Sequence, residues 1–279
     1  MIATASATAA PRLGLLFDEP DADYRRSGAW GSTEIRAWLT NPDGFRLRYV
    51  DRHPLAAFHG NDATELGTLV HLLLQGEEHY RARCVIAPPE CFTEAGYRSR
   101  SKQAQTLFDR FALVGKLALS PAEDAKARFL ADRVRANPVA LRLMTGGRAE
   151  VTGRLRDPHT GLMVQARFDV LHDDWIVDYK TTASPIRSFK WQVRDYLLHV
   201  QAALYDAVRV GVTGRPRVPF YWAVQSTVWP FECRVIECPE ALLDAGMLEV
   251  DRALTGIAAG DYGTPQQEPE VLDGVPGAA

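Results

Sequence analysis

Hydrophobic and polar side chains alternate regularly along residues 164–171, just past the middle of the chain. The apolar members of this alternation are Val164, Ala166, Phe168 and Val170. A period of two is typical of a strand with one buried face. A short acidic turn follows, and the apolar run at 175–177 indicates a second, more deeply buried strand. The pattern therefore predicts two adjacent strands in the protein core.

The rest of the chain predicts a mixed sheet flanked by helices. Further strands are expected at 148–156, 217–225 and 229–237, the last two as a hairpin. Helices are expected from Ser32 to the Asn41-Pro42 break, over 67–76, from the capping box at Ser120 to about 136, from the 190s to 210, and from Pro239 to about 259. In the helix that ends near 210, Val200, Leu204 and Val208 mark the inward stripe. This order of elements is typical of an α/β (α+β) protein.

A single domain is expected between two less ordered ends. Residues 1–28 show no sustained period and predict a flexible N-terminal arm, and the polar residues 261–279 predict a frayed tail. The intervening region, 29–260, divides into a mainly helical part at 29–147 and a strand-rich core at 148–260.

Composition favours a soluble protein of a reducing cytosol. The chain has 279 residues, of which 46% are hydrophobic, and a formal net charge of −3, which still allows a local basic channel. Its four cysteines have spacings of 7 and 5 within pairs and lack a C-x-x-C metal pattern. No apolar run suits a membrane span, and the N-terminus lacks the features of a signal peptide. We expect a cytoplasmic protein with no membrane partner.

Two carboxylates and an ammonium group converge at the end of the predicted buried strands. Asp178 and Lys180 are two residues apart and so share a strand face, and Asp169 lies near the end of the neighbouring strand. Such a cluster is costly to bury without a counter-ion. One interpretation is a Mg²⁺ or Mn²⁺ site for phosphodiester hydrolysis, in which Lys180 orients water or stabilises developing charge. The alternatives are a surface Asp-x-Lys pair and a buried ion network without metal.

Two other features each allow a structural and a functional interpretation. His71 is the one titratable residue of the apolar helix at 67–76, and taken alone it is best explained as a core histidine. Arg98, Arg100 and Lys102 lie close together in a polar stretch. They form either a solvated helix face or a surface that contacts phosphates.

Four motifs, in order, resemble the PD-(D/E)XK nuclease superfamily. They are G-T-L-V-H at 67–71, R-F-D at 167–169, I-V-D-Y-K-T-T at 176–182 and H-V-Q-A-A-L-Y at 199–205. Over roughly residues 30–210, the chain is most similar to the exodeoxyribonuclease VIII (RecE-type) and RecB-like branches. The resemblance implies a restriction-endonuclease-like core: a central mixed β-sheet flanked by helices, with a helical N-terminal part.

The resemblance implies roles for individual residues. The implied metal ligands are His71, Asp169, Asp178 and the backbone carbonyl of Tyr179, with Glu150 as a further candidate that is equally well explained as a strand-edge carboxylate. The implied catalytic residues are Lys180, Asp178 and Asp169, together with Gln201 and Tyr205, which share one helix face. The implied DNA contacts are Arg167, Thr181 and Thr182, and the more distant Arg98, Arg100 and Lys102.

The resemblance also implies an activity, cofactors and partners. RecE-type enzymes degrade linear duplex DNA from 5′ ends, as ring-shaped oligomers that work with a single-strand annealing protein in recombination or repair. The resemblance implies a bacterial or phage-encoded protein and one or two Mg²⁺ or Mn²⁺ ions. The cysteines that hold an iron–sulfur cluster in some relatives are missing, so no cluster is expected, and without a Walker-type motif the chain is not expected to be a motor. The usual Pro-Asp form of the motif is also absent, since Phe168 precedes Asp169.

Other functions stay open at the level of sequence. A single-strand exonuclease or a structure-specific endonuclease would use the same core, because end preference depends on the shape of the DNA channel. A non-catalytic DNA-binding or assembly protein is disfavoured by the intact Asp169, Asp178 and Lys180.

Overall fold

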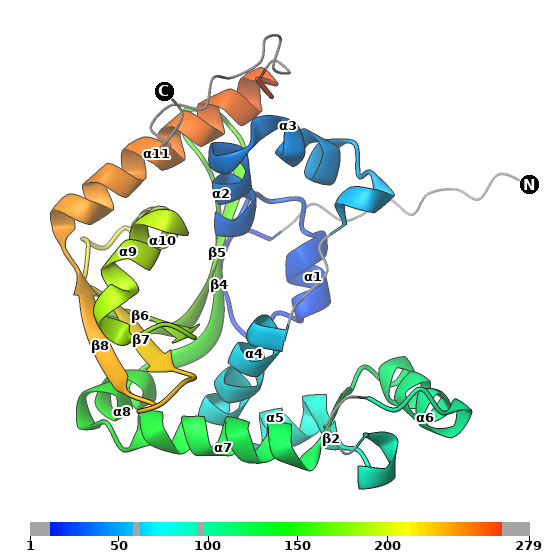
Figure 1. The fold of residues 1–279 in the computed structure, drawn as a ribbon. Coiled ribbons are helices and arrows are strands. Elements are labelled where there is room, and N and C mark those ends of the chain that lie inside the picture. Colours follow the sequence, from blue (N-terminus) through cyan, green and yellow to red (C-terminus); the bar gives the residue numbers. More distant parts are fainter. Residues whose placement is uncertain (1–11, 58–61, 94–97, 264–279) are drawn as a thin grey trace, which may run out of the picture.

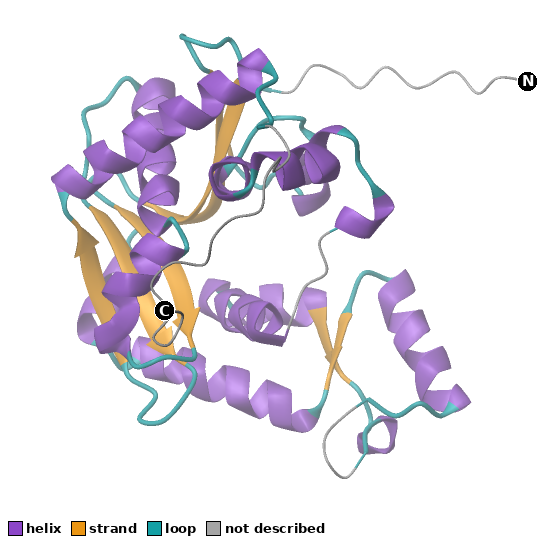
Figure 2. Cartoon of the chain, turned by 45° about the horizontal axis from the view of Figure 1, so that its top comes forward, coloured by secondary structure: helices purple, strands orange, loops and turns teal. Residues whose placement is uncertain are grey.

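A six-stranded sheet forms the centre of the computed structural model, which describes residues 12–57, 62–93 and 98–263. Helices cover both faces of this sheet (Figure 1 and Figure 2). Its strands, in spatial order, are β1 (Gly14–Leu16), β4 (Arg148–Arg156), β5 (Met163–Leu171), β6 (Ile176–Thr182), β7 (Phe220–Ser226) and β8 (Cys233–Cys238). β6 and β7 are parallel, and the other neighbouring strands of this sheet are antiparallel. The mixed sheet flanked by helices confirms the predicted fold class.

Eleven α-helices lie within the described ranges. They are α1 (Asp21–Arg26), α2 (Ser32–Thr40), α3 (Pro42–Phe45), α4 (Asp62–Gln75), α5 (Glu77–Arg83), α6 (Lys102–Leu113), α7 (Pro121–Arg135), α8 (Pro138–Thr145), α9 (Phe189–Asp195), α10 (Leu198–Thr213) and α11 (Glu240–Ala259). The predicted capping box begins α7: the Ser120 hydroxyl accepts the Glu123 N–H at 3.2 Å, and the Glu123 carboxylate accepts the Ser120 N–H at 2.7 Å. The predicted starts at Ser32, Ser120 and Pro239 are confirmed by α2, α7 and α11. The helix expected over 67–76 begins earlier, at Asp62, and the helix expected from the 190s is divided into α9 and α10.

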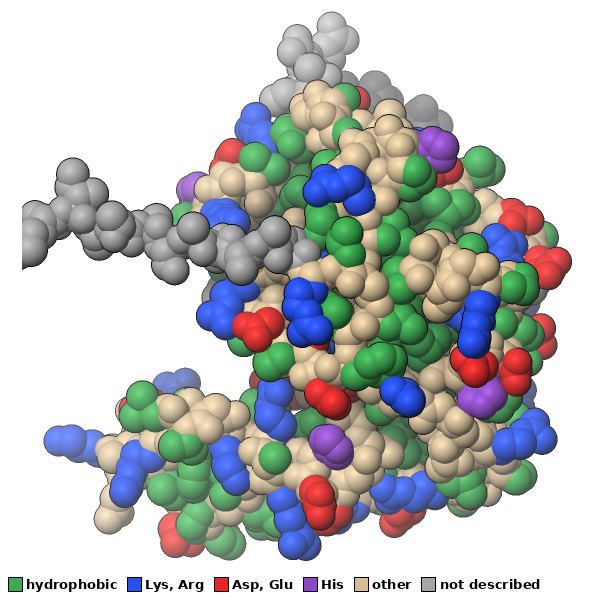
Figure 3. All heavy atoms as spheres, turned by 180° about the vertical axis from the view of Figure 1, so that it is seen from behind, with side chains coloured by type: hydrophobic (Ala, Val, Ile, Leu, Met, Phe, Trp, Pro, Cys, Tyr) green, Lys and Arg blue, Asp and Glu red, His purple; other side chains and the backbone are tan. Residues whose placement is uncertain are grey.

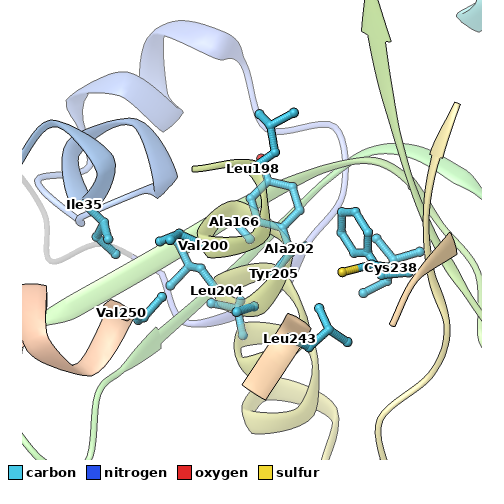
Figure 4. Close-up of a cluster of buried hydrophobic side chains, with 14 of the residues drawn as sticks. Ile35, Ala166, Leu198, Val200, Ala202, Leu204, Tyr205, Cys238, Leu243 and Val250 are labelled. Atoms are coloured by element: carbon cyan, nitrogen blue, oxygen red, sulfur yellow. The ribbon is translucent and has the colours of Figure 1, made fainter. Parts of the chain in front are cut away.

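Two hydrophobic cores lie on opposite faces of the sheet. One joins α2, α10 and α11 to the sheet, and the other joins α4, α5, α7 and α8 to it. Figure 4 shows Val200 and Leu204 of α10 packed in the first core, near Ile35 and Val250. The predicted inward stripe of this helix is therefore buried, which fixes the rotation of α10 and the direction in which its polar residues point.

Residues 12–27 differ from the expected flexible arm. β1 pairs with β4, and α1 follows it. Arg154 of β4, which is 1% exposed, pairs with Glu19 at 3.0 Å and donates to the Gln165 side chain at 2.8 Å. A three-residue strand and a six-residue helix are too short to give a visible period, so the sequence pattern missed them. We call residues 12–27 the N-terminal strap. The preceding residues, 1–11, lie outside the described residues.

A small lobe projects from the body of the molecule (Figure 1). It contains α6 and the parallel pair β2 (Cys84–Ile86) and β3 (Leu117–Leu119), which the sequence pattern did not predict. Figure 3 shows the surface hollowed between this lobe and the rest of the protein. The division into a helical part and a strand-rich core stays a prediction.

The C-terminal helix packs back on the N-terminal part. α11 contacts α2, and the Trp38 ring donates to the carbonyl of Asp261 at 2.8 Å. The predicted frayed tail lies outside the described residues from 264 onward. None of the described helices combines the length and apolar character that crossing a bilayer requires.

Gly246 of α11 allows close approach to α10, which generates a prediction about stability. A Cβ at this position would lie 2.4 Å from the carbonyl oxygen of His199. We expect Gly246→Ala to lower the free energy of unfolding by roughly 1–3 kcal/mol despite the better helix propensity of alanine. Urea denaturation measures the change. The exposed neighbour Ala245 provides a control, since Ala245→Gly should cost only about 1 kcal/mol through propensity. A Gly246→Ala protein as stable as the parent would show that the helices do not approach so closely.

Candidate metal centre

β5 and β6 diverge at Asp169 and Asp178. The ladder between these strands contains only two residue pairs, both before this point on β6. Beyond them, the Asp169 carboxylate accepts the backbone N–H of Tyr179 at 2.7 Å. We call this point of divergence the fork. Here a side chain replaces a backbone acceptor, and the Asp169 carboxylate is oriented beside β6.

Three side chains from three different elements meet at this fork. His71 of α4, Glu150 of β4 and Asp169 of β5 each offer one ligand atom, and these atoms all lie within 4.8 Å of one another. The Nδ1 atom of His71 is 3.4 Å from Glu150 Oε1. All three residues are partly buried. The geometry therefore groups Glu150 with the predicted site residues.

Glu150 is held in a strained backbone conformation. Its φ of +54° lies in the left-handed region, which is unfavourable for a residue with a side chain in the middle of a strand. Gln75 donates to Glu150 Oε1 at 3.0 Å, and Arg167 Nε lies 3.0 Å from Glu150 Oε2. Burial raises the pKa of Glu150, while His71 opposes the rise. These contacts fix a carboxylate that faces the other two cluster residues.

Asp178 and Lys180 form a second group beside the cluster. Lys180 Nζ lies 2.6 Å from Asp178 Oδ2, as expected for two residues on one strand face. Gln201 of α10 donates to the other carboxylate oxygen at 2.9 Å. Asp178 is 1% exposed, and burial raises its pKa to about 6, with Lys180 opposing the rise and nearby Asp169 adding to it. Asp178 thus belongs to the site, but its carboxylate faces Lys180.

Tyr205 is buried one helical turn after Gln201. Its ring packs edge to face against Phe168, with centroids 5.4 Å apart. Burial raises the pKa of Tyr205 well above its usual value, so the phenol stays neutral. Gln201 thus contacts the site directly through Asp178, whereas Tyr205 contacts Phe168, the residue before Asp169.

Sequence reasoning missed two residues near these groups, Arg36 and Gln75. Arg36 of α2 donates to the carbonyl of Tyr196 at 3.0 Å, and burial lowers its pKa while Tyr205 and Asp178 oppose that effect. Gln75, which holds Glu150, shares a helix face with His71 at i and i+4, a spacing that could have identified it. No local signal points to Arg36, because its neighbours in space come from distant parts of the chain.

The predicted DNA contacts fall into two groups. Arg167 is enclosed: it pairs with Glu150 and, at 3.1 Å, with Asp21 of the N-terminal strap. Thr182 is buried, and its hydroxyl accepts from Gln192 at 2.8 Å. The remaining candidates are the partly buried Thr181 and the exposed Arg98, Arg100 and Lys102, of which the last three lie on the projecting lobe. A DNA contact by each of these six residues stays a prediction. Arg167 and Thr182 are engaged within the protein, and Arg98 also donates to the Ala118 carbonyl at 3.2 Å.

The residues of the cluster fit a hard divalent cation. Two carboxylates and an imidazole are ligands that Mn²⁺ and Mg²⁺ accept. Among the described residues, the buried Nε2 atom of His71 has no hydrogen-bond partner. An imidazole with one nitrogen within 4.8 Å of two carboxylates and an unpartnered Nε2 atom suits a positive ion better than the interior of a hydrophobic core. The tautomer of His71 would be set by its contact with Glu150.

Comparisons with known proteins give a family and a similar fold. A family described as a PDDEXK-like domain of unknown function (DUF3799) matches residues 52–264. In fold, the chain is similar to a crystal structure from Eubacterium rectale described as a "putative exonuclease", with 15% sequence identity and a TM-score of 0.63. That similarity covers 91% of this chain and 97% of the other, and at this identity it shows the fold alone.

No curated protein matches the sequence. The predicted membership of the PD-(D/E)XK superfamily is confirmed, while the RecE-type branch stays a prediction. The family match spans well over half of the chain and includes His71, Glu150, Asp169, Asp178 and Lys180. The chain therefore belongs to the family described as the PDDEXK-like domain of unknown function (DUF3799).

Proposed function

We propose that this protein is a metal-dependent deoxyribonuclease that hydrolyses phosphodiester bonds at the ends of linear duplex DNA. The observation that carries the proposal is the His71–Glu150–Asp169 cluster beside the ion pair of Asp178 and Lys180. The family match and the likeness in fold to a protein described as an exonuclease support it.

In this proposal His71, Glu150 and Asp169 hold one Mg²⁺ or Mn²⁺ ion, with Asp178 and the carbonyl of Tyr179 as further ligands. A divalent cation held there would activate water and offset the negative charge that develops on the phosphorus. The two clustered carboxylates repel each other without a cation, so the same ion also stabilises the folded site.

Lys180 is the proposed catalytic cation. Asp178 holds its ammonium at 2.6 Å, and Gln201 holds Asp178 in turn, so the Lys180 Nζ atom is restrained beside the cluster. From there it donates a hydrogen bond to the attacking water or to an oxygen of the scissile phosphate. Arg167 acts as a positioning residue, because it orients Glu150 and is itself held by the N-terminal strap.

The finer points rest on the resemblance in sequence. Digestion from 5′ ends, a role in recombination or repair, an annealing partner and a ring-shaped oligomer stay predictions. A single-strand exonuclease or a structure-specific endonuclease would use the same cluster. These alternatives differ in the DNA that they accept, so substrate choice separates them.

We expect Lys180→Ala to reduce cleavage roughly 10²-fold or more, because it removes a charged donor from the reacting phosphate. Digestion of linear duplex DNA, labelled at the 5′ or the 3′ end and run beside a closed circle with Mg²⁺ or with EDTA, measures this loss. The matched control is Lys126→Ala, an exposed lysine on α7, which should leave cleavage unchanged.

The labels also test the proposed substrate. Metal-dependent loss of the linear DNA alone, with the 5′ label released first, agrees with the proposal. Cutting of the circle would instead indicate an endonuclease. If Lys180→Ala cleaves as fast as the parent protein, Lys180 has no part in the reaction.

Metal binding should also appear as a change in stability. We expect Mg²⁺ or Mn²⁺ at a hundredfold excess over its Kd to stabilise the protein by about 2.7 kcal/mol, seen as a rise in Tm. Asp169→Asn should remove this rise and should melt higher than the parent in EDTA, since one of two facing charges is gone. The amide oxygen can still accept the Tyr179 N–H. Asp109→Asn on α6 is the control for an exposed carboxylate. An equal metal response in Asp169→Asn and the parent would remove Asp169 from the ligand set.

A further inference from the structure

We propose that the outer face of residues 186–196 binds single-stranded DNA next to the metal centre. This segment comprises a short 3₁₀ turn, Ile186–Ser188, and α9. Its outward side chains, which we call the α9 surface, are Arg187, Lys190, Trp191, Arg194 and Tyr196. The inference rests on the proposed nuclease function, because it names the part of the substrate that would lie beside the reacting phosphate.

The segment is joined directly to the strand that carries Lys180. The Gln192 side chain, on the inner side of α9, donates to the Thr182 hydroxyl at 2.8 Å. At the other end of the segment, the Tyr196 carbonyl accepts from Arg36 at 3.0 Å. Thr182 lies two residues after Lys180, and the partly buried Arg36 interacts electrostatically with Asp178. The α9 surface therefore begins where the proposed catalytic strand ends.

Hydrophobic patterning divides α9 into an inner and an outer side. Phe189 and Val193 are buried in the core. Lys190, Trp191 and Arg194 recur at helical spacing on the exposed side. The Trp191 side chain is 59% exposed, and the Lys190 ammonium lies 5.1 Å from the centre of its ring. A large aromatic ring and a cation are thus presented together to the solvent.

The cations of this surface lack acidic partners. Within the described residues, Arg187, Lys190 and Arg194 form no ion pair, although the chain as a whole carries a net charge of −3. Asp195 is the one carboxylate in the sequence 183–199. By contrast, Arg128 of α7, on the other side of the sheet, pairs with both Glu77 and Asp124. Unpaired cations beside exposed aromatic rings are the features that bind a phosphate backbone and stack unpaired bases.

Single-stranded DNA fits this surface better than a second copy of the chain. Packing the same face of another copy against it would enclose six arginine and lysine groups with only two copies of Asp195, at a desolvation penalty. DNA supplies phosphates for the cations. Unpaired bases also offer their faces to Trp191 and Tyr196, whereas the bases of an intact duplex are stacked on one another and cannot.

Binding in EDTA tests the proposal without cleavage. The full chain is titrated with a fluorescent oligothymidylate and with a blunt duplex of the same length, at several salt concentrations. Replacing Arg187, Lys190 and Arg194 together by Gln should reduce the slope of log K against log salt for the single strand by about 2, because each phosphate contact contributes about 0.7. The matched control replaces Arg83, Lys126 and Arg142 by Gln, three exposed cations on α5, α7 and α8, and should keep the slope of the parent.

A second variant separates stacking from charge. Trp191→Ala should weaken oligothymidylate binding about tenfold with the salt slope unchanged, because stacking on one base is worth about 1–3 kcal/mol. Binding of the blunt duplex should not change. Trp191→Phe keeps an aromatic ring and should restore most of the affinity. The side chains are exposed, so the Tm of each variant should match that of the parent.

Three results would overturn the proposal. The first is an unchanged salt slope in the triple Gln variant, or an equal change in its control. The second is an equal loss of single-strand and duplex affinity in Trp191→Ala. The third is a lower mass of Trp191→Ala in sedimentation with DNA binding intact, which would make this face a subunit contact.

The binding result is independent of the cleavage result. Loss of single-strand binding in the α9 variants, in a protein that cleaves no DNA with any metal, would support the α9 surface and reject the nuclease. Cleavage by the parent together with normal binding by the α9 variants would support the nuclease and reject the α9 surface.

Discussion

The hydrogen bond from the Tyr179 backbone to the Asp169 carboxylate is the interaction on which the candidate site depends. If β5 and β6 paired along their whole length, their facing backbone N–H and C=O groups would be hydrogen-bonded to each other. Here the ladder stops after two pairs, and a carboxylate takes over as acceptor. The fork opens a polar position inside a well-packed sheet, and side chains from α4, β4 and β6 gather around it. Strong, short hydrogen bonding to a charged acceptor stabilises an otherwise unfavourable break in the sheet.

A second set of contacts links the N-terminal strap to the same position. Arg167 lies between Glu150 and Asp21, and its guanidinium also covers the Tyr24 ring. The strap thus completes the sheet edge through β1 and supplies the charge that holds Arg167. Because Glu150 has a left-handed φ, its orientation must be maintained by such external contacts. We infer that the strap contributes to the geometry of the site although it lies far from it in sequence.

The sequence predicted the parts of the fold that carry a regular period or a clear cap. The strands around Phe168 and Ile176, the capping box at Ser120 and the inward stripe of α10 were correct for this reason. The strap and the strands β2 and β3 of the lobe consist of elements of three to six residues, too short to show a period. By contrast, α6 has 12 residues, and it was missed because this stretch was interpreted only as a polar segment. Within the site, motif order pointed to His71, Asp169, Asp178 and Lys180, which the structure brings close together. The enclosed position of Arg167 depends on tertiary contacts and could not be read from alternation alone.

The central claim is that His71, Glu150 and Asp169 form a cation site and are not a buried polar cluster. The most direct measurement is an anomalous difference map from crystals of the protein soaked in Mn²⁺. The account predicts a strong peak among the three side chains, with the His71 ring nitrogen and both carboxylates as ligands. A map with no peak at this position at saturating Mn²⁺, with His71 still in contact with Glu150 alone, would contradict the account and make His71 a core histidine.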